Sequence, residues 1–303
     1  MQERARLMEY FFENGAAYCE NTAAPCVVLP APYEATVSFG RGTALAPDAI
    51  LNASRQLELF DEELCRPVNF AVQTLPPVDC RGPATAVMPR LQQTAAGVLD
   101  ADRFLLTLGG EHSISAPLII AAARRYPDLT VLHLDAHLDL RDRYEGDPGS
   151  HACVMRRVLE MGLPVVHVGI RSLCDEEHRL VCARRLPVFW GRDLTAPASG
   201  WVAQVLALLS ARVYLSLDAD VLDPSLMPAT GTPEPGGLGW YDVLTLLREV
   251  FTRRQVVAAD LVEAVPVAGM VLGEYTAARL AAKMLIYHQY AGLDSRPVAE
   301  ARI

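Results

Sequence analysis

Short apolar runs alternate with longer segments of helical spacing along most of the chain. We expect the short runs to form buried strands and the longer segments to form helices. The strands are expected at residues 26–29, 104–108, 130–134, 164–170, 213–217 and 256–261. The helices are expected at residues 47–57, 88–99, 115–126, 151–161, 201–209, 241–253 and 275–290. This alternation predicts an α/β fold with a mostly parallel sheet and helices on both faces.

The composition is that of an ordinary globular protein, with 51% hydrophobic and 21% charged residues in a chain of 303. No Pro/Gly/Ser-rich linker or block of charge interrupts residues 112–220, so we expect one domain over residues 1–303. No apolar run approaches the ~18 residues that a membrane-spanning helix needs, so no membrane partner is expected. The net charge of −9 argues against a nucleic-acid partner and favours a cationic ligand.

The seven cysteines are scattered, odd in number and include no Cys-x-x-Cys pair. They stand at positions 19, 26, 65, 80, 153, 174 and 182. This pattern speaks against a disulfide scaffold and against a zinc finger. It favours a reducing, cytoplasmic location.

Six side chains of metal-binding type fall in three short clusters near the ends of expected strands. They are His112 in Gly-Gly-Glu-His-Ser, Asp135, His137 and Asp139 in Asp-Ala-His-Leu-Asp, and Asp218 and Asp220 in Asp-Ala-Asp. Two imidazoles and four carboxylates are too many ligands for one ion, and they suit a pair of hard or borderline divalent metals. A metal pair implies hydrolysis by a metal-activated water.

Strand periodicity predicts how these side chains converge. Asp135 and His137 should point the same way, because positions two apart share one face of an extended strand. Asp139 can fold back over them from the following loop, and Asp218 and Asp220 share a face in the same manner. We expect the three ligand-bearing strands to be adjacent and parallel, so that their carboxyl ends build one crevice.

The simplest interpretation of a lone Asp-x-Asp pair, or of a single histidine after Gly-Gly, is a solvated loop or a turn. Three such clusters at the ends of buried strands are harder to explain in that way. Unpaired carboxylates in a half-buried place carry a large desolvation cost. A pair of metal ions neutralises them.

These motifs resemble the signatures of the ureohydrolases, the arginase and agmatinase family. The resemblance rests on the three clusters and on Pro-Ala-Thr-Gly-Thr-Pro after the aspartate pair, and it extends from Pro32 to Glu263. It implies an arginase-like fold, which is a three-layer α/β/α domain around a parallel sheet. It also implies two Mn²⁺ ions per subunit and a homo-oligomer, either a trimer or a hexamer.

The resemblance also assigns ligands. The ligands of one ion are expected to be His112, Asp135, Asp139 and either Asp218 or Asp220. The bridging and second-ion ligands are expected among Asp135, His137, Asp218 and Asp220, and the spacing does not reveal which carboxylates bridge. Asp139 is further expected to orient the nucleophile.

Three more residues match substrate and proton-transfer positions of that family. Glu263 matches the glutamate that binds the guanidinium group, which a carboxylate can hold by two parallel hydrogen bonds. His151 matches the histidine that passes protons to the departing amine, a role that suits imidazole near neutral pH. Thr232 is expected to contact the substrate. By residue type alone, Glu263 would be a surface residue after a strand and His151 a residue at a helix start.

The remaining histidines carry less weight. His133 shares a strand face with Asp135, and a hydrogen-bonded core histidine is the favoured interpretation. His167, His178 and His288 have no companions in the sequence, so we expect them to be structural or exposed.

The loop of residues 140–150 bears on the substrate. Its acids Asp142, Glu145 and Asp147 would repel the carboxylate of arginine but suit an amine, although Arg141 and Arg143 partly cancel this effect. This loop and the following Gly-Ser-His-Ala-Cys-Val-Met-Arg-Arg run look more like those of agmatinases than those of arginases. The resemblance therefore implies agmatine as the cationic guanidino substrate, with putrescine and urea as products. Such a reaction belongs to polyamine metabolism and putrescine biosynthesis.

Three alternatives stay open. After Glu263 the chain has Val265-Pro-Val-Ala-Gly-Met where many agmatinases have another pattern, in a stretch that lines the outer pocket of the family. An aminopropyl-agmatine ureohydrolase or an arginase is therefore an alternative. A metal-binding member without catalysis is a further one, which the retention of Glu263 and His151 disfavours.

Overall fold

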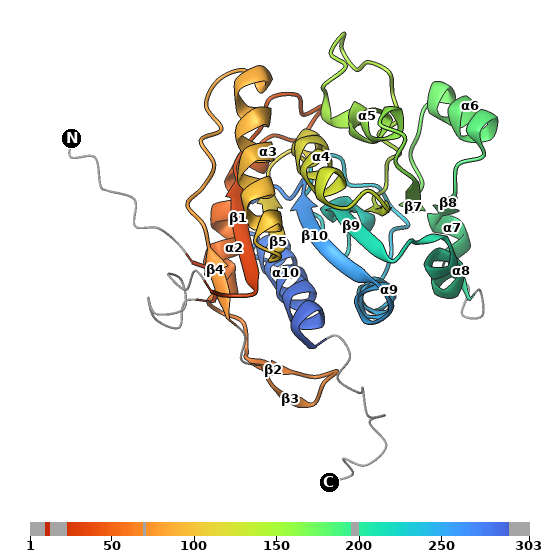
Figure 1. The fold of residues 1–303 in the computed structure, drawn as a ribbon. Helices are drawn as coiled ribbons and strands as arrows, with labels where there is room; N and C mark the ends of the chain where they lie inside the picture. The colour runs from red at the N-terminus through yellow and green to blue at the C-terminus, as the bar shows by residue number, and fades with distance from the viewer. Residues whose placement is uncertain (1–9, 13–22, 69–70, 195–199, 291–303) are drawn as a thin grey trace.

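An eight-stranded parallel sheet forms the centre of the molecule (Figure 1). This computed structural model describes residues 10–12, 23–68, 71–194 and 200–290. The strand order is β4-β1-β5-β10-β9-β6-β7-β8. The bounds are β1 Cys26–Ala31, β4 Val72–Thr74, β5 Phe104–Gly109, β6 Leu129–Leu134, β7 Val165–Ile170, β8 Val188–Trp190, β9 Arg212–Asp218 and β10 Gln255–Val262. The sequence-based prediction of a mostly parallel sheet is confirmed.

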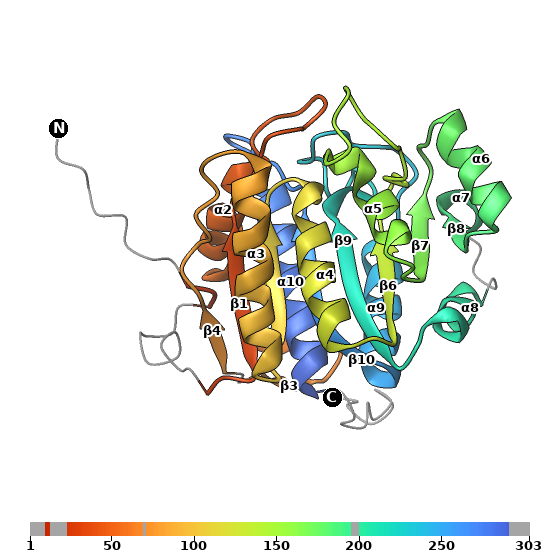
Figure 2. The same ribbon diagram turned by 45° about the horizontal axis from the view of Figure 1, so that its top comes forward.

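Helices cover both faces of this sheet and give the fold its three layers (Figure 2). They are α2 Ala46–Ser54, α3 Ala84–Asp100, α4 Ser115–Arg125, α5 Val154–Glu160, α6 Asp175–Arg184, α7 Gly191–Leu194, α8 Trp201–Leu208, α9 Trp240–Arg253 and α10 Leu272–Tyr290. Helices α3, α4 and α5 lie on one face, and α2, α9 and α10 lie on the other. The expected arginase-like three-layer α/β/α architecture is confirmed.

Strand alternation explains why the core is divided in two. Along β1, Val27 and Leu29 pack with the helices of one face, whereas Cys26 and Val28 pack with those of the other face. Successive side chains of a strand point to opposite sides. Because both sides are covered, β1 is apolar throughout rather than alternating with polar residues.

The observed strand order corrects one expectation. The strands β5, β6 and β9, which precede the ligand clusters, are not all adjacent, because β10 pairs with β5 on one side and with β9 on the other. Pairing between distant strands leaves no local signal in the sequence. The consequence is functional, since β10 delivers Glu263 into the middle of the crevice.

Several short elements were not expected from the sequence. They are β4, β8, α6, α7 and a hairpin formed by β2, Phe60–Asp61, and β3, Arg66–Pro67. Helix α3 also begins four residues before the expected start, directly after Pro83. Each expected strand and helix has a counterpart of the same type at its position.

The loop of the β2–β3 hairpin is tied to α10 by a buried lysine, which we call the Lys283 cluster. Lys283 is 0% exposed, and its Nζ lies 2.7 Å from Asp61 Oδ2, 3.0 Å from Glu62 Oε1 and 2.9 Å from Glu63 Oε2. The hydroxyl of Tyr287 donates to Glu63 as well. Burial opposes the charge of Lys283, yet these carboxylates raise its pKa above the usual value.

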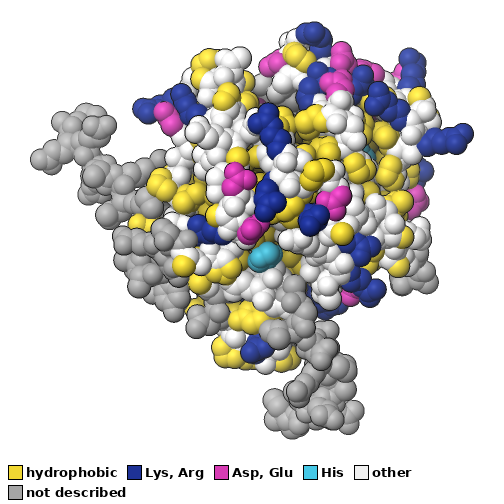
Figure 3. Space-filling view, viewed as in Figure 1, with side chains coloured by type: hydrophobic (Ala, Val, Ile, Leu, Met, Phe, Trp, Pro, Cys, Tyr) yellow, Lys and Arg dark blue, Asp and Glu magenta, His cyan; other side chains and the backbone are white. Residues whose placement is uncertain are grey.

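The surface mixes charges of both signs. In the view of Figure 3, Lys and Arg side chains lie close to Asp and Glu side chains rather than in separate regions. Among the described helices, none is long and apolar enough to cross a bilayer. The six described cysteines are free thiols, and Cys19 lies outside the described residues.

Candidate metal centre and substrate pocket

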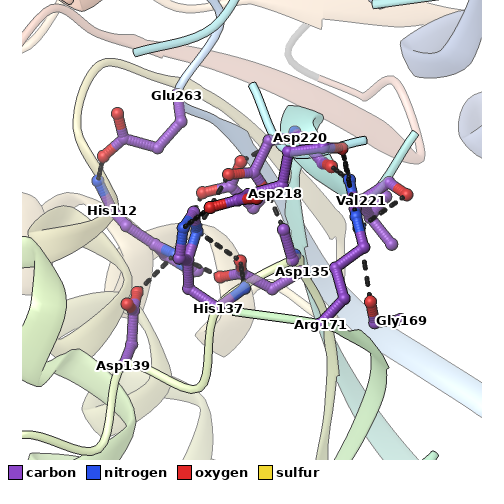
Figure 4. Close-up of polar contacts among 12 residues, drawn as sticks. His112, Asp135, His137, Asp139, Gly169, Arg171, Asp218, Asp220, Val221 and Glu263 are labelled. Carbon is purple, nitrogen blue, oxygen red and sulfur yellow. Dashed lines mark hydrogen bonds and ion pairs between the residues drawn. The ribbon is translucent and has the colours of Figure 1, made fainter. Parts of the chain in front are cut away.

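The expected ligand residues meet at the carboxyl ends of β5, β6 and β9 (Figure 4). His112 opens a short 3-10 turn after β5, Asp135 directly follows β6, and Asp218 ends β9. The structure also brings His137, Asp139 and Asp220 to this place, so all six side chains converge.

Three carboxylates surround one nitrogen of His112. Its Nδ1 lies 3.2 Å from Asp135 Oδ2, 3.0 Å from Asp139 Oδ2 and 3.4 Å from Asp218 Oδ2. His112 and Asp135 are both 0% exposed, so solvent does not separate these groups. Among the described residues this nitrogen is nevertheless a buried polar atom without a hydrogen bond.

The opposite nitrogen of His112 shows why Nδ1 can act as a ligand. Nε2 lies 2.9 Å from Ser216 Oγ, and the Ser216 hydroxyl donates to Asp260 at 2.8 Å. Because a hydroxyl has one hydrogen, Ser216 must accept the Nε2–H of His112. Nδ1 is then free to direct its lone pair toward a cation, as in metal sites where the other ring nitrogen is fixed by a hydrogen bond.

A second group of ligand atoms shares Asp135 with the first. His137 Nδ1 lies 3.0 Å from Asp220 Oδ2 and 3.5 Å from Asp135 Oδ1. Asp135 therefore presents one oxygen to each group, so it is the residue that the two candidate ligand groups share. In two groups of residues, the possible ligand atoms all lie within 4.8 Å of one another. The first group is His112, His133, Asp135 and Asp139, and the second is Asp135, His137 and Asp220.

Backbone hydrogen bonds hold the carboxylates in place. Asp218 Oδ1 accepts from the Asp220 amide at 2.9 Å, and Asp220 Oδ1 accepts from the Ala136 amide at 3.0 Å. In both residues the other oxygen faces the cluster. In each carboxylate a backbone amide thus fixes one oxygen, and the second oxygen is available to bind a metal ion.

The charges of this cluster are not balanced by the chain itself. Burial and the neighbouring carboxylates raise the pKa of Asp218 well above its usual value, and they also raise the pKa of Asp220. Burial opposes the charge of His137, yet Asp135 and Asp220 raise its pKa to about 12. Two divalent cations fit this donor set.

Arg171 supports the ligand loop from below. Its guanidinium donates to the carbonyl oxygens of Asp220 at 2.6 Å and of Glu234 at 2.7 Å, and to Gly169 at 3.2 Å (Figure 4). A planar guanidinium with five donors suits such a set of carbonyls. Arg171 joins the turn that bears Asp220 to the loop that bears Thr232 and Glu234.

Two buried histidines lie behind the cluster, and His133 is the hydrogen-bonded core histidine that the sequence predicted. His133 Nε2 lies 2.9 Å from Asp135 Oδ2, and His133 Nδ1 lies 2.9 Å from His167 Nδ1. His167 is buried, in line with the expected structural role, whereas its contact with His133 was not predicted. The contact between them could not be found from the linear sequence, since His133 and His167 become neighbours only as register partners on the parallel strands β6 and β7.

A cavity of about 300 Å³ opens above the ligand cluster. His151, Thr232 and Glu263 line it, together with the candidate ligands His112, His137, Asp139, Asp218 and Asp220. The sequence-predicted substrate residues are thus in one place, while their roles stay predictions.

The acids expected from the loop of residues 140–150 do not line this cavity. Asp142 instead accepts from Arg157 of α5 at 3.0 Å, and the loop contributes Arg141 and Tyr144 to the wall. The wall acids are Glu177 and Glu234, which the sequence analysis did not single out. Of the stretch that begins at Glu263, only Glu263 reaches the wall, because the Val265 amide pairs with Ala229 O at 2.7 Å and carries the chain away.

Glu263 is held where β10 ends. Its Oε1 accepts from the backbone amide of His112 at 2.6 Å, which aligns the carboxylate with the ligand turn. Burial raises the pKa of Glu263 to about 8, although the His112 amide lowers it. Glu263 and Asp139 both adopt left-handed backbone conformations, with φ of 61° and 52°. Such conformations in non-glycine residues concentrate at functional sites.

Comparison with known proteins agrees with this geometry. The model of the Arginase family matches residues 24–288. The chain belongs to the arginase family. Within this family it is 41% identical over 275 residues to the N(1)-aminopropylagmatine ureohydrolase of Synechocystis, covering 87% of this chain and 89% of that protein.

Two further arginase-family relatives are similar over most of their length. The agmatinase of Bacillus cereus is 37% identical over 250 residues, which cover 80% of this chain and 83% of the relative. The crystal structure of the agmatine ureohydrolase of Thermoplasma volcanium superposes with a TM-score of 0.83 at 29% identity, covering 93% of this chain and 95% of that chain. The predictions of a ureohydrolase of this family and of a hydrolase acting on guanidino compounds are confirmed.

Proposed function

We propose that this arginase-family chain hydrolyses the guanidino group of an alkyl polyamine and releases urea, with two Mn²⁺ ions per subunit. The observation that carries the proposal is the pair of ligand groups that share Asp135 at the floor of the cavity. When bound, the ions supply an activated water and positive charge. Manganese suits the carboxylate-rich donor set.

Each remaining role falls to a residue of the chain. Glu263 binds the guanidinium by charge-assisted hydrogen bonds and orients its central carbon over the ligand cluster. Asp139, next to His112, accepts a hydrogen bond from the attacking water and orients it. His151 gives a proton to the departing amine, and Thr232 contacts the substrate from the cavity wall.

The substrate we favour is N(1)-aminopropylagmatine, with agmatine as the second candidate. The 41% identical relative carries the first name and the 37% identical relative the second. Glu177 and Glu234 add negative charge to the cavity wall, which suits a polycationic tail and disfavours the carboxylate of arginine. Hydrolysis would yield urea and the corresponding triamine, or urea and putrescine from agmatine.

A substrate panel tests this proposal. Full-length protein loaded with Mn²⁺ is assayed for urea release from N(1)-aminopropylagmatine, agmatine and arginine. We expect kcat/KM to be highest for the first and lowest for arginine. A higher kcat/KM for agmatine than for N(1)-aminopropylagmatine would select the second candidate. If none of the three substrates released urea, the chain would be a non-catalytic member of the family.

Glu263→Gln tests the assignment of the guanidinium site. It removes the counter-charge of a buried cation, and we expect a loss of ~3–5 kcal/mol in transition-state stabilisation. Asp142→Asn is the matched control, because this acid stands in the loop above the cavity but pairs with Arg157. Equal catalytic efficiency of Glu263→Gln and Asp142→Asn would remove Glu263 from the site.

A further inference from the structure

We propose that Glu111, acting through the hydroxyl of Thr36, fixes the tautomer of His151 so that Nε2 is the nitrogen that exchanges protons with the substrate. This inference rests on the proposed function for its chemical consequence, and on hydrogen-bond geometry for the tautomer. Glu111 and Thr36 are positioning residues in this scheme. Neither of them touches the ligand cluster through its side chain in the described structure.

Glu111 is a fully buried carboxylate whose oxygens are all occupied. Oε2 accepts from the backbone amides of Ala35 and Thr36, the second at 2.6 Å. Oε1 accepts from Thr36 Oγ1 at 2.8 Å and from Ser113 Oγ at 2.6 Å. A carboxylate offers about four lone-pair sites, and here four donors fill them. Both hydroxyls must therefore point their hydrogens at Glu111.

A close backbone approach brings these groups together. The Glu111 amide donates to Tyr33 O at 2.9 Å, and a Cβ on Gly110 would lie 2.0 Å from that same oxygen. Only glycine permits this contact. The turn that carries Glu111 and His112 is thereby clamped to the segment that carries Thr36.

The hydroxyl of Thr36 connects Glu111 with His151. Oγ1 lies 3.1 Å from His151 Nδ1, and it accepts from the His151 backbone amide at 3.0 Å. Its single hydrogen is directed to the Glu111 carboxylate, which is the stronger, charge-assisted acceptor. Its two lone pairs remain for the amide and for Nδ1. Nδ1 must therefore carry a hydrogen and donate it to Thr36.

A second hydroxyl near Nδ1 does not reverse this assignment. Ser150 Oγ lies 3.2 Å from His151 Nδ1 and could accept the same hydrogen or donate its own. If Ser150 donated, the lone pairs of Nδ1 and Thr36 Oγ1 would face each other at 3.1 Å. That arrangement is repulsive, so Ser150 acts as an additional acceptor.

The other ring nitrogen faces the cavity. Nε2 lies 3.0 Å from Ser38 Oγ, and both His151 and Ser38 line the cavity wall. With the hydrogen fixed on Nδ1, a neutral His151 presents Nε2 as a base, and a protonated His151 presents Nε2–H as an acid. The imidazole is further oriented by the edge of Tyr144, whose ring centroid is 5.6 Å away.

The water oxygen bonds to the guanidino carbon and loses one proton to solvent. The bond between that carbon and the alkyl nitrogen then breaks, and its electron pair stays on the nitrogen. The hydroxyl added to the carbon loses its proton to solvent as the urea carbonyl forms. The nitrogen takes the proton from Nε2 of the imidazolium, and His151 is left neutral with its hydrogen on Nδ1. A proton from solvent restores the imidazolium before the next turnover.

Thr36→Val tests the proposal, because it keeps the shape and removes the hydroxyl. Its steady-state kinetics are measured with Mn²⁺, and its tautomer by ¹⁵N NMR of imidazole-labelled full-length protein loaded with diamagnetic Zn²⁺. His151→Gln assigns the signals. We expect kcat to fall about 10-fold with KM within about twofold, as for the loss of one part of a general acid. We also expect the neutral His151 of the wild type to carry its hydrogen on Nδ1, and Thr36→Val to lose that preference.

Two further variants separate this relay from mere loss of structure. Thr36→Ser retains the hydroxyl and should restore kcat and the wild-type ¹⁵N signals. Ser113→Ala removes the other hydroxyl from Glu111 without touching His151, and it should leave the tautomer unchanged. A wild-type His151 with its hydrogen on Nε2, or a Thr36→Val variant with wild-type kcat and signals, would overturn the proposal. If the wild type released no urea, the proposed function would fail while the ¹⁵N signals still decided the tautomer.

Discussion

The Lys283 cluster and the ligand cluster both gather carboxylates in the described structure, and these carboxylates are neutralised in different ways. In the Lys283 cluster, Asp61 and Glu63 surround a lysine of the same chain at 2.7 Å and 2.9 Å. At the ligand cluster, the ion pairs described for Asp135, Asp139, Asp218 and Asp220 involve only histidines. The first group is complete as folded. The second requires cations from outside.

This difference separates a structural role from a functional one. A buried charge with its partner on the chain holds two elements together, here α10 and the β2–β3 hairpin. A buried set of carboxylates without such a partner keeps its desolvation cost until an ion binds. Carboxylates thus contribute to stability in the Lys283 cluster and to chemistry in the ligand cluster.

The largest expected effect follows from breaking the ligand cluster. Asp220→Ala removes a ligand oxygen and should lower kcat/KM for urea release by more than about 10³-fold, with loss of bound metal. Metal content and urea release are measured on the same preparation. The exposed Asp175→Ala on α6 is the control, and undiminished urea release by Asp220→Ala would rule out the two-ion scheme.

Breaking the Lys283 cluster should instead affect stability. Lys283→Met leaves the buried carboxylate of Asp61 without its cation, and we expect the free energy of unfolding to fall by ~3–5 kcal/mol with unchanged metal content. Arg279→Met is the matched control, because its ion pair with Glu62 is partly exposed and should contribute less than ~1 kcal/mol. Denaturant titration measures both, and equal effects would remove the distinction between them.

Asp218→Asn sharpens the comparison from the opposite side. In metal-free protein this change removes one of several mutually repelling carboxylates, so we expect the free energy of unfolding to rise by about 1–2 kcal/mol. With Mn²⁺ present the wild type should have the larger free energy of unfolding, because it binds the ions better than Asp218→Asn does. A variant that is less stable than the wild type in both conditions would show that the cluster is balanced without metal.

The smallest expected effect tests a buried group away from both clusters. Burial against Phe104 and Phe251 lowers the pKa of His288 to about 4. Between pH 6.5 and 4 the unfolded chain therefore binds a proton that the folded chain does not, and stability falls as the pH falls through this range. His288→Gln should flatten this dependence by about 1 kcal/mol, allowing for partial exposure. If the stability of His288→Gln depended on pH as steeply as that of the wild type, this prediction would be wrong.

The sequence predicted the elements and the ligand residues because both depend on local periodicity. Apolar runs mark the strands, and the two-residue spacing of Asp135 and His137 places both side chains toward one site. The order of the strands was not predictable, since the insertion of β10 between β5 and β9 depends on pairing between distant segments. For the same reason the contact between His133 and His167 was missed.

The cavity wall was harder still to predict. Asp142 was expected to face the substrate, but Arg157 of the next helix draws it away. Glu177 reaches the wall from the first turn of α6 and Glu234 from the loop before α9, and no spacing in the sequence connects them. Residues on strand ends were thus predictable, whereas residues on loops depended on partners that only the folded chain provides.

Titration of metal-free, full-length protein with Mn²⁺ tests the central claim most directly. Bound Mn²⁺ per chain and urea released from N(1)-aminopropylagmatine and agmatine are followed together. The shared position of Asp135 predicts saturation at two ions per chain, with urea release that appears as the second ion binds. Saturation at a single ion, or full urea release at one ion per chain, would contradict it.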